Sequence, residues 1–324
     1  MTETQKDLVP VLDLGAFLAH EPGALAATAS QLRDALERIG FFFVINHGVP
    51  WSLVEDTFAA AARFHALDDE VKATIPFGGD RGGYLTLGGG TSYASRIAGD
   101  VRKPNLNAAF FVHGSSNEER NQWPPEAACP GFRRQVDAYF AATQALGTAM
   151  LPLYALALGL PAGYFERSFD RPSCSLRMSH YPVVEHEDQQ WGLAPHTDSS
   201  FMTLLPDNAV AGLEIKPEGY DWIRPPALAE SYLVNAGDIL RRWTNDRFLS
   251  TGHRVFNASG QDRYAIPFFY APRTNAPIAC LPSCTGAGNP PRYEPTTYGD
   301  YLRWFMNRNY AGVTGQSVTD DDMP

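Results

Sequence analysis

Three residues of this 324-residue chain have the types and spacing that a transition-metal site requires. His196 and Asp198 stand two apart in the segment Ala194-Pro195-His196-Thr197-Asp198, and His253 opens a later run of high β-propensity. Residues two apart on a β-strand point to the same face, so this imidazole and carboxylate can converge on one ion. A third ligand from elsewhere would complete a two-histidine, one-carboxylate face with open coordination positions, which suits Fe(II), Zn or Mn. The tripeptide alone is weak evidence, because His-x-Asp often arises by chance.

Arg263 is the second residue with chemical potential. It opens a β-prone run in which period-2 alternation places Arg263, Ala265, Pro267 and Phe269 on one face. A buried arginine needs an anionic partner, and its planar fork fits a carboxylate in bidentate fashion. A salt bridge to one of the 36 acidic residues is the simpler interpretation when Arg263 is taken alone.

The part of the chain after position 174 must supply the strands that position these residues. It consists of short β-prone runs separated by turns, a texture typical of an antiparallel sandwich or barrel such as a double-stranded β-helix. A barrel would return His253 to the end that holds His196 and Asp198. The runs predicted as strands are 175–181, 201–205, 212–215, 232–235, 253–257 and 263–270.

The N-terminal part mixes helical and extended patterns, and a long glycine-rich stretch over 77–103 without a clear period predicts a functional loop. An edge strand is expected at 9–14, where Pro10 lacks an amide donor, and a buried strand at 41–45. Apolar residues at helical spacing predict helices over 23–39, 52–65, 131–160 and 298–310, the third kinked or ended by Pro152.

These patterns predict an α+β fold with a mainly β core, a double-stranded β-helix (jelly-roll barrel) with flanking N-terminal helices and a C-terminal helix. We expect a single catalytic unit over 1–324. Within it, a mixed helical lobe covers 1–120, the barrel core covers 170–280, and a C-terminal helix with an acidic tail covers 296–324.

Composition limits the classes of partner. The chain is 44% hydrophobic and 19% charged, with 26 basic against 36 acidic residues and a net charge of −10. This balance argues against a nucleic-acid or anionic-membrane surface, and no apolar run approaches the roughly 20 residues of a membrane span. The four cysteines have no paired spacing and are predicted to be plain thiols. We expect a cytoplasmic protein, a monomer or weak homo-oligomer, that acts on a small molecule.

Several short motifs follow one another in an order that is far more specific than any one of them. They are Val9–Leu14, Gly40–Val49, Tyr181-Pro182, His196-Thr197-Asp198, Asn235-Ala236-Gly237-Asp238, Arg242-Trp243-Thr244-Asn245, His253-Arg254-Val255 and Arg263–Phe269. Over nearly its whole length the chain resembles the non-haem iron, 2-oxoglutarate-dependent oxygenases of the isopenicillin N synthase-like branch.

The resemblance implies a role for each matching residue. His196, Asp198 and His253 would bind Fe(II), while Arg263 and Tyr181 would hold the cosubstrate 2-oxoglutarate. With O2, such an enzyme oxidises an unactivated C–H bond, and hydroxylation is the default outcome beside desaturation or cyclisation. Two positions depart from the family pattern: Ala265 replaces the usual serine of Arg-x-Ser, and Ser179 stands where plant members commonly carry asparagine, two residues before the tyrosine.

Two rival functions follow from the same residues. An Fe(II)/O2 oxidase of the isopenicillin N synthase type would use no 2-oxoglutarate, and Ala265 favours it. A β-barrel binding protein would keep the fold without the chemistry, which the intact metal triad opposes. For the substrate, a small organic and amphipathic molecule, the expected pocket residues are Tyr84, Asn107, Phe110, Arg177 and Phe269.

Overall fold

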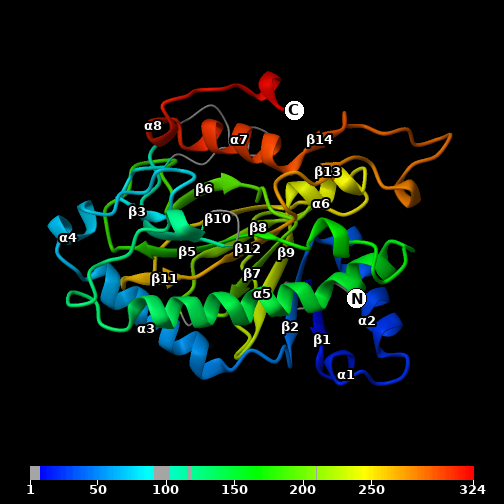
Figure 1. The fold of residues 1–324 in the computed structure, drawn as a ribbon, viewed down its shortest axis with the longest axis horizontal. Coiled ribbons are helices and arrows are strands. Elements are labelled where there is room, and N and C mark those ends of the chain that lie inside the picture. The colour runs from blue at the N-terminus through cyan, green and yellow to red at the C-terminus, as the bar shows by residue number, and fades with distance from the viewer. Residues whose placement is uncertain (1–7, 91–102, 115–117, 209) are drawn as a thin grey trace.

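The computed structural model describes residues 8–90, 103–114, 118–208 and 210–324. A large mixed sheet runs through its centre (Figure 1). The strands follow the order β1-β2-β9-β7-β12-β5-β4-β3, and β11 also pairs with β5. Their bounds are β1 Val11–Asp13, β2 Phe41–Ile45, β3 Gly83–Leu85, β4 Ala108–His113, β5 Ser173–Tyr181, β7 Met202–Pro206, β9 Tyr232–Ala236, β11 Arg263–Ala265 and β12 Phe268–Ala271.

A second, smaller antiparallel sheet lies beside the first. It has the order β6-β10-β8, with β6 at Leu193–His196, β10 at Gly252–Val255 and β8 at Leu213–Lys216. The register pairs His253 directly with His196, so the two imidazoles of the predicted metal triad lie on neighbouring strands. The pairing of β10 with β6 therefore brings His253 back to His196, as we expected of a barrel.

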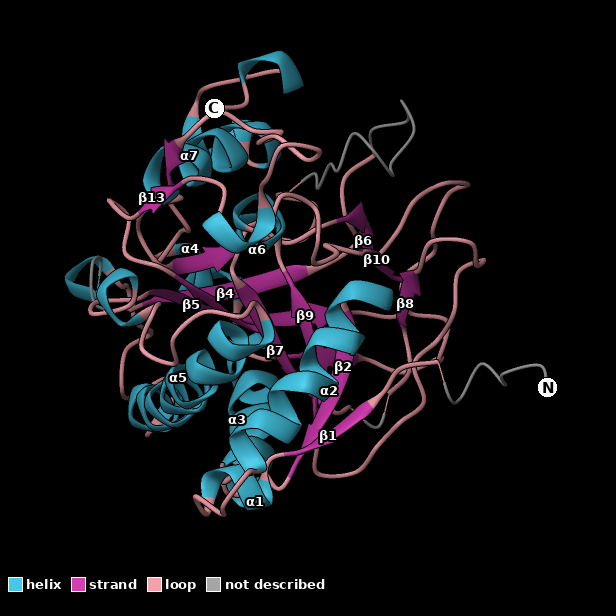
Figure 2. Ribbon diagram, turned by 90° about the vertical axis from the view of Figure 1, so that its right-hand side faces the viewer, coloured by secondary structure: helices cyan, strands magenta, loops and turns pink. Residues whose placement is uncertain are grey.

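Three long helices cover one face of the large sheet: α2 (Ala24–Arg38), α3 (Trp51–His65) and α5 (Phe132–Ala157) (Figures 1 and 2). Each places its apolar stripe in the main core, as helical periodicity requires. Side chains alternate along β5: Leu176 and Met178 join this core. Arg177, Ser179 and Tyr181 face the other way. The face opposite the helices is thus free to carry a polar site.

The helix α5 continues past Pro152 to Ala157, so this proline does not end the helix. Among the described residues, α5 is also the one helix long and apolar enough to span a membrane. Half of its most apolar window is buried within the fold. Its side chains are those of a central core helix, in contact with α2, α3 and β12.

The helix α7 (Tyr298–Asn309) packs over the other side of the molecule, at the top of Figure 1. Thr297 caps it by accepting a hydrogen bond of 3.2 Å from the amide of Asp300. The shorter elements are α1 Gly15–Leu18, α4 Asp69–Ala73, α6 Asp238–Trp243, α8 Ala311–Thr314, the ladder of β13 Pro277–Ile278 with β14 Thr296–Thr297, and 3-10 turns at Glu118–Arg120, Glu166–Ser168, Pro282–Cys284 and Asp320–Asp322.

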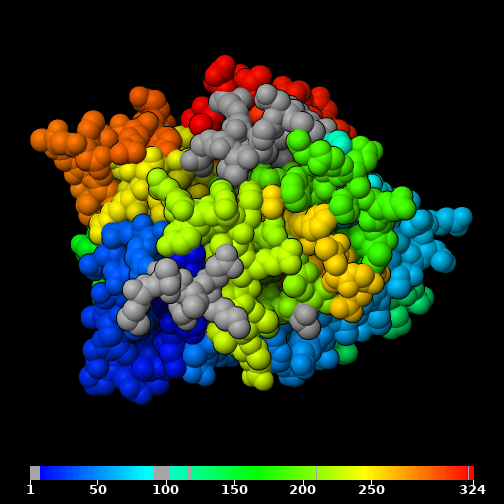
Figure 3. Space-filling view, turned by 180° about the vertical axis from the view of Figure 1, so that it is seen from behind, coloured from blue at the N-terminus to red at the C-terminus, as the bar shows by residue number. Residues whose placement is uncertain are grey.

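The N-terminal segment is built into the large sheet instead of standing apart from it. β2 pairs with β9, with Phe41 opposite Asn235, and β4 pairs with β5 along most of its length. Viewed from behind, N-terminal residues (blue) lie directly against central residues (yellow-green) (Figure 3). Strands of the predicted 1–120 lobe therefore pair with strands of the 170–280 core in one sheet.

Candidate active site

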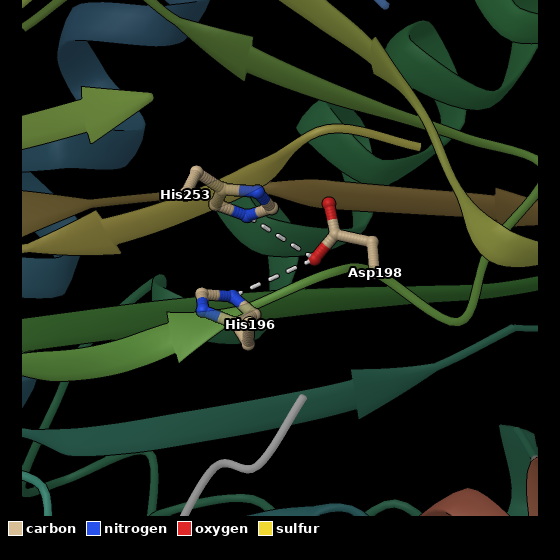
Figure 4. A group of neighbouring side chains, drawn as sticks. All are labelled: His196, Asp198 and His253. Atoms are coloured by element: carbon tan, nitrogen blue, oxygen red, sulfur yellow. Dashed lines mark ion pairs between the residues drawn. The ribbon is translucent and has the colours of Figure 1, made fainter. Parts of the chain in front are cut away.

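The triad His196, Asp198 and His253 comes together as a compact cluster between the two sheets (Figure 4). All three residues are buried, and one ligand atom from each lies within 4.8 Å of the others. The Nε2 atoms of His196 and His253 lie 3.7 and 3.5 Å from the same carboxylate oxygen, Oδ1 of Asp198. Two imidazole nitrogens and one carboxylate oxygen facing a common point form the donor set of a mononuclear transition-metal site.

Backbone carbonyls fix the orientation of both rings. Nδ1 of His196 donates to the carbonyl oxygen of Ala194 at 2.8 Å, and Nδ1 of His253 donates to that of Thr251 at 3.2 Å. A carbonyl can only accept, so each Nδ1 carries a proton, and in the neutral ring each Nε2 then has its lone pair for a metal. The two rings thus enter the site as preset ligands.

Asp198 is placed differently from the sequence-based expectation. We predicted it on the same strand as His196, whereas β6 ends at His196 and Asp198 lies in the following loop. Its position comes from two side chains of the large sheet, because Thr203 on β7 and Asn235 on β9 donate to Oδ2 at 2.6 and 2.8 Å. Oδ2 is thereby occupied, and Oδ1 is left to face the histidines.

The loop that carries Asp198 is also anchored through the segment Asn235–Asp238. The amide of Asp238 donates to the carbonyl oxygen of Asp198 at 2.7 Å, and the carboxylate of Asp238 accepts from Thr197 at 2.9 Å. A Cβ at Gly237 would collide with the carbonyl oxygen of Ser200, so the close approach requires glycine. These positioning residues were not singled out by residue type, although their motif was one of those that carried the family resemblance.

Electrostatics favours the ligating forms of His196 and Asp198, whereas the neighbouring Asp198 carboxylate raises the pKa of His253 against the effect of burial. Burial, reinforced by neighbouring His253, lowers the pKa of His196 to about 3, so its imidazole is neutral near pH 7. Burial alone would raise the pKa of Asp198, but His253, His196 and the hydrogen bond from Thr203 hold that pKa well below its usual value. A neutral imidazole and an ionised carboxylate are the protonation states that a divalent metal needs.

Arg263 and Tyr181 form a second cluster beside the triad. Their strands pair Arg263 with Tyr181, and the guanidinium lies 5.1 Å from the centre of the tyrosine ring. Nε of Arg263 donates to the carbonyl oxygen of Val210 at 3.1 Å, while its buried Nη1 has no hydrogen-bond partner. Among the described residues no carboxylate pairs with this cation, so the simple salt-bridge interpretation of Arg263 is wrong there.

The orphaned guanidinium nitrogen fits an anionic cosubstrate. A small inner cavity of about 60 Å³ joins Arg263 and Tyr181 to the metal triad, and Ala265, Pro267 and Phe269 line it as alternation predicted. A dicarboxylate in this cavity would satisfy Arg263 at one end and reach the triad at the other. The residues present therefore suit both the metal and the cosubstrate that the family resemblance implies.

A larger outer cavity of about 620 Å³ opens beside His196 and Asp198 of the triad. Of the predicted pocket residues, Arg177 and Phe269 line both cavities. Helix α7 and the residues after it line much of the outer cavity, with Leu302, Met306 and Tyr310 among them. None of the five predicted pocket residues belongs to this C-terminal wall, so the wall was not predicted.

Three of the predicted pocket residues lie elsewhere. Phe110 is fully buried in the core against Phe64, and its neighbour Phe111 lines the outer cavity instead. Adjacent strand residues point to opposite faces, and the run 108–112 is apolar on both faces. The sequence pattern therefore could not show which of the two phenylalanines faces the cavity. Tyr84 packs against the ring of His65 and under the ammonium of Lys72.

Asn107 supports the cavity from behind without lining it. Its Oδ1 accepts a hydrogen bond of 2.5 Å from Nη2 of Arg177, and its Nδ2 donates to the carbonyl oxygen of Gly192 at 2.5 Å. Arg177 also lies over the ring of Phe111, with its guanidinium carbon 5.3 Å from the ring centre, while its buried Nε has no partner. Asn107 thus holds the guanidinium of Arg177 through Nη2 and leaves the Nε donor free.

Comparisons with known proteins agree with this geometry. The model of the 2OG-Fe(II) oxygenase superfamily matches residues 172–272, and that of the non-haem dioxygenase in morphine synthesis N-terminal region matches residues 9–126. A 2-oxoglutarate-Fe(II) type oxidoreductase of Emericella nidulans, hxnY, is 32% identical over 93% of this chain and 90% of its own. The proline hydroxylase buaE of Petromyces alliaceus is 32% identical over 87% of this chain and 93% of its own.

Solved structures give the same picture. A full-length protein of Neurospora crassa, solved in complex with alpha-KG, superposes with a TM-score of 0.81 at 26% identity, covering 91% of this chain and 94% of that one. The structure of JOX2 in complex with 2OG, Fe and JA has a TM-score of 0.77 at 25% identity, covering 92% and 84%. The large and small sheets are thus those of the predicted jelly-roll barrel. By its motifs, its fold and these relatives, the chain belongs to the 2OG-Fe(II) oxygenase superfamily.

Proposed function

We propose that His196, Asp198 and His253 are the protein ligands of Fe(II) in this 2-oxoglutarate-dependent dioxygenase. The observation that carries the assignment is the convergence of two Nε2 atoms on Oδ1 of Asp198, whose other oxygen is already hydrogen-bonded. Three protein ligands on one side of an ion leave positions for the cosubstrate and O2.

We propose further that Arg263, supported by Tyr181, binds the distal carboxylate of 2-oxoglutarate. The buried, unpaired Nη1 of Arg263 supports this role, since a guanidinium without an anion is costly to bury. The rival oxidase function, which needs no 2-oxoglutarate, receives no support from relatives named as 2-oxoglutarate enzymes. We keep the isopenicillin N synthase-like branch as the proposed position within the superfamily.

The reaction divides its tasks between the bound groups and the chain. When bound, Fe(II), 2-oxoglutarate and O2 supply the oxidising power for an unactivated C–H bond, with 2-oxoglutarate decarboxylated to succinate. The chain fixes the ligand geometry through Ala194, Thr251, Thr203 and Asn235, and it orients the cosubstrate through Arg263. Burial of the three side chains limits their contact with bulk water. Hydroxylation is the proposed outcome.

The outer cavity is proposed to hold the substrate, a small amphipathic molecule. Its wall combines apolar side chains such as Phe111 and Met306 with the guanidinium of Arg177 beside the triad. The free Nε of Arg177 supports a substrate that carries a carboxylate or another acceptor. With Arg177→Met, we expect a carboxylate-bearing substrate to lose more affinity than 2-oxoglutarate, whose distal carboxylate is proposed to bind Arg263.

The iron assignment is tested by Fe(II) affinity under anaerobic conditions. We expect His196→Ala to abolish stoichiometric iron binding and turnover, whereas His186→Ala, a change at an exposed histidine outside both cavities, should leave iron binding as in the wild type. Undiminished iron affinity in His196→Ala would remove the assignment.

A further inference from the structure

Ser179 has a buried hydroxyl group that the fold leaves without a partner. The residue is fully buried on β5, and its Oγ has no hydrogen-bond partner among the described residues. An unsatisfied buried hydroxyl is costly, and native proteins keep one chiefly where a ligand or water completes it. Ser179 therefore points to a bound group that is part of the working protein.

The hydroxyl belongs to the inner cavity. Ser179 lines that cavity together with Arg263 and Tyr181, whereas Arg177, two residues earlier on the same face, lines both cavities. Alternation along β5 sets this order, since residues 177, 179 and 181 share a face. Ser179 thus stands beside the site proposed for the cosubstrate and outside the one proposed for the substrate.

The strand register places Ser179 directly across from Ala265. In the antiparallel β5–β11 pairing, Arg263 lies opposite Tyr181 and Ala265 lies opposite Ser179. Cβ atoms of directly opposed residues are about 4.5–5.5 Å apart, within the reach of one small side chain. Ala265 itself packs with Tyr181, Leu193 and Val255 in a small apolar cluster and offers no donor.

We propose that Ser179 supplies, from the opposite strand, the hydroxyl donor to 2-oxoglutarate that Ala265 cannot provide. This inference rests on the proposed role of Arg263 as the anchor of the distal carboxylate. In this pair the hydroxyl group stands on β5 at Ser179 instead of on β11 at position 265. It still lies on the face of the sheet that carries Arg263. The hydroxyl that Ala265 lacks is then supplied from β5.

The test is the dissociation constant of 2-oxoglutarate for anaerobic, Fe(II)-loaded protein, measured by calorimetry. Ser179→Ala should weaken binding by about 10-fold or more, the range expected for one hydrogen bond to a charged group. In the double variant Ser179→Ala/Ala265→Ser, the hydroxyl returns on the other strand, and affinity should recover to within about 3-fold of the wild type. A merely structural serine would show no such rescue.

A matched control is Ser250→Ala, which removes another buried hydroxyl without a partner, outside both cavities. It should leave the dissociation constant unchanged. Wild-type affinity in Ser179→Ala, or failure of Ala265→Ser to rescue it, would overturn the role of Ser179 and leave the role of Arg263 standing. Loss of 2-oxoglutarate binding in Ser179→Ala but not in Arg263→Ala would instead overturn the anchor and the inference together.

Discussion

Asn235 donates a hydrogen bond of 2.8 Å to Oδ2 of Asp198 and so decides which carboxylate oxygen faces the histidines. The contact joins β9 of the large sheet to a loop that has no strand of its own to hold it. A metal ligand on a loop keeps its geometry only if such outer contacts restrain it. Asn235 is thus part of the proposed iron site, because it positions a ligand although it does not itself bind the metal.

Replacing Asn235 by alanine should weaken Fe(II) binding by about 10- to 100-fold, the usual effect of removing an outer-shell partner of a metal ligand. Competition with a chelator of known affinity measures the change. Asn289→Ala, at an exposed loop asparagine that bonds the carbonyl oxygen of Cys284, is the control and should bind iron as the wild type does. Equal affinity in all three proteins would contradict a positioning role for Asn235.

Gly237 should tolerate no side chain. An added Cβ would meet the backbone of Ser200, and backbone cannot move aside as a flexible side chain can. We expect Gly237→Ala to lower the melting temperature by several degrees and to reduce iron affinity, because the Asp198 loop is bonded to the next residue, Asp238. Gly260→Ala offers a contrast, since no atom lies within 4 Å of the added Cβ and only its positive φ resists the change. A melting temperature for Gly237→Ala equal to that of the wild type would show that the loop adapts.

Stability should depend on pH through His65, which is buried at the end of α3 and bonds the carbonyl oxygen of Met178 on β5 at 2.9 Å. Burial lowers the pKa of His65 from 6.5 to about 3 in the folded protein. Below pH 6.5 the unfolded chain therefore binds a proton at His65 that the folded chain does not, so the free energy of unfolding falls as pH drops from 6.5 towards 3.

The variant His65→Gln keeps a hydrogen-bond donor and removes the titration. Its free energy of unfolding, from urea titrations between about pH 7 and 4.5, should fall less steeply than that of the wild type. The difference in slope can reach about 1.4 kcal/mol per pH unit for one group. Parallel curves for the two proteins would mean that His65 does not titrate in this range.

Local patterns sufficed for most of the fold, and their limits are visible at particular residues. The strand 41–45 was predicted with its observed bounds, because it is a short apolar run closed by a turn. Phe110 and Phe111 could not be told apart, because both faces of β4 are buried and only the tertiary structure sets the phase. Helix α7 shows an amphipathic pattern, but that pattern does not say which cavity its apolar side will close.

The candidate site shows the same division. Residue types and spacing pointed to His196, Asp198 and His253 as metal ligands, and the structure brings the three together. The partners that hold Asp198, Thr203 and Asn235, are common polar residues on distant strands, and no spacing rule connects them to the triad. Ser179 was visible only as a departure from a family pattern, and its position opposite Ala265 required the strand register.

The central claim is that Fe(II) on the triad and a carboxylate anchor at Arg263 together bind 2-oxoglutarate. The most direct measurement is a titration of 2-oxoglutarate into anaerobic, Fe(II)-loaded protein, followed through the visible iron-to-ketoacid charge-transfer band. We predict a saturable band in the wild type and its loss in Arg263→Ala at the same cosubstrate concentration, with iron still bound. No band in the wild type with iron bound, or an undiminished band in Arg263→Ala, would contradict the account.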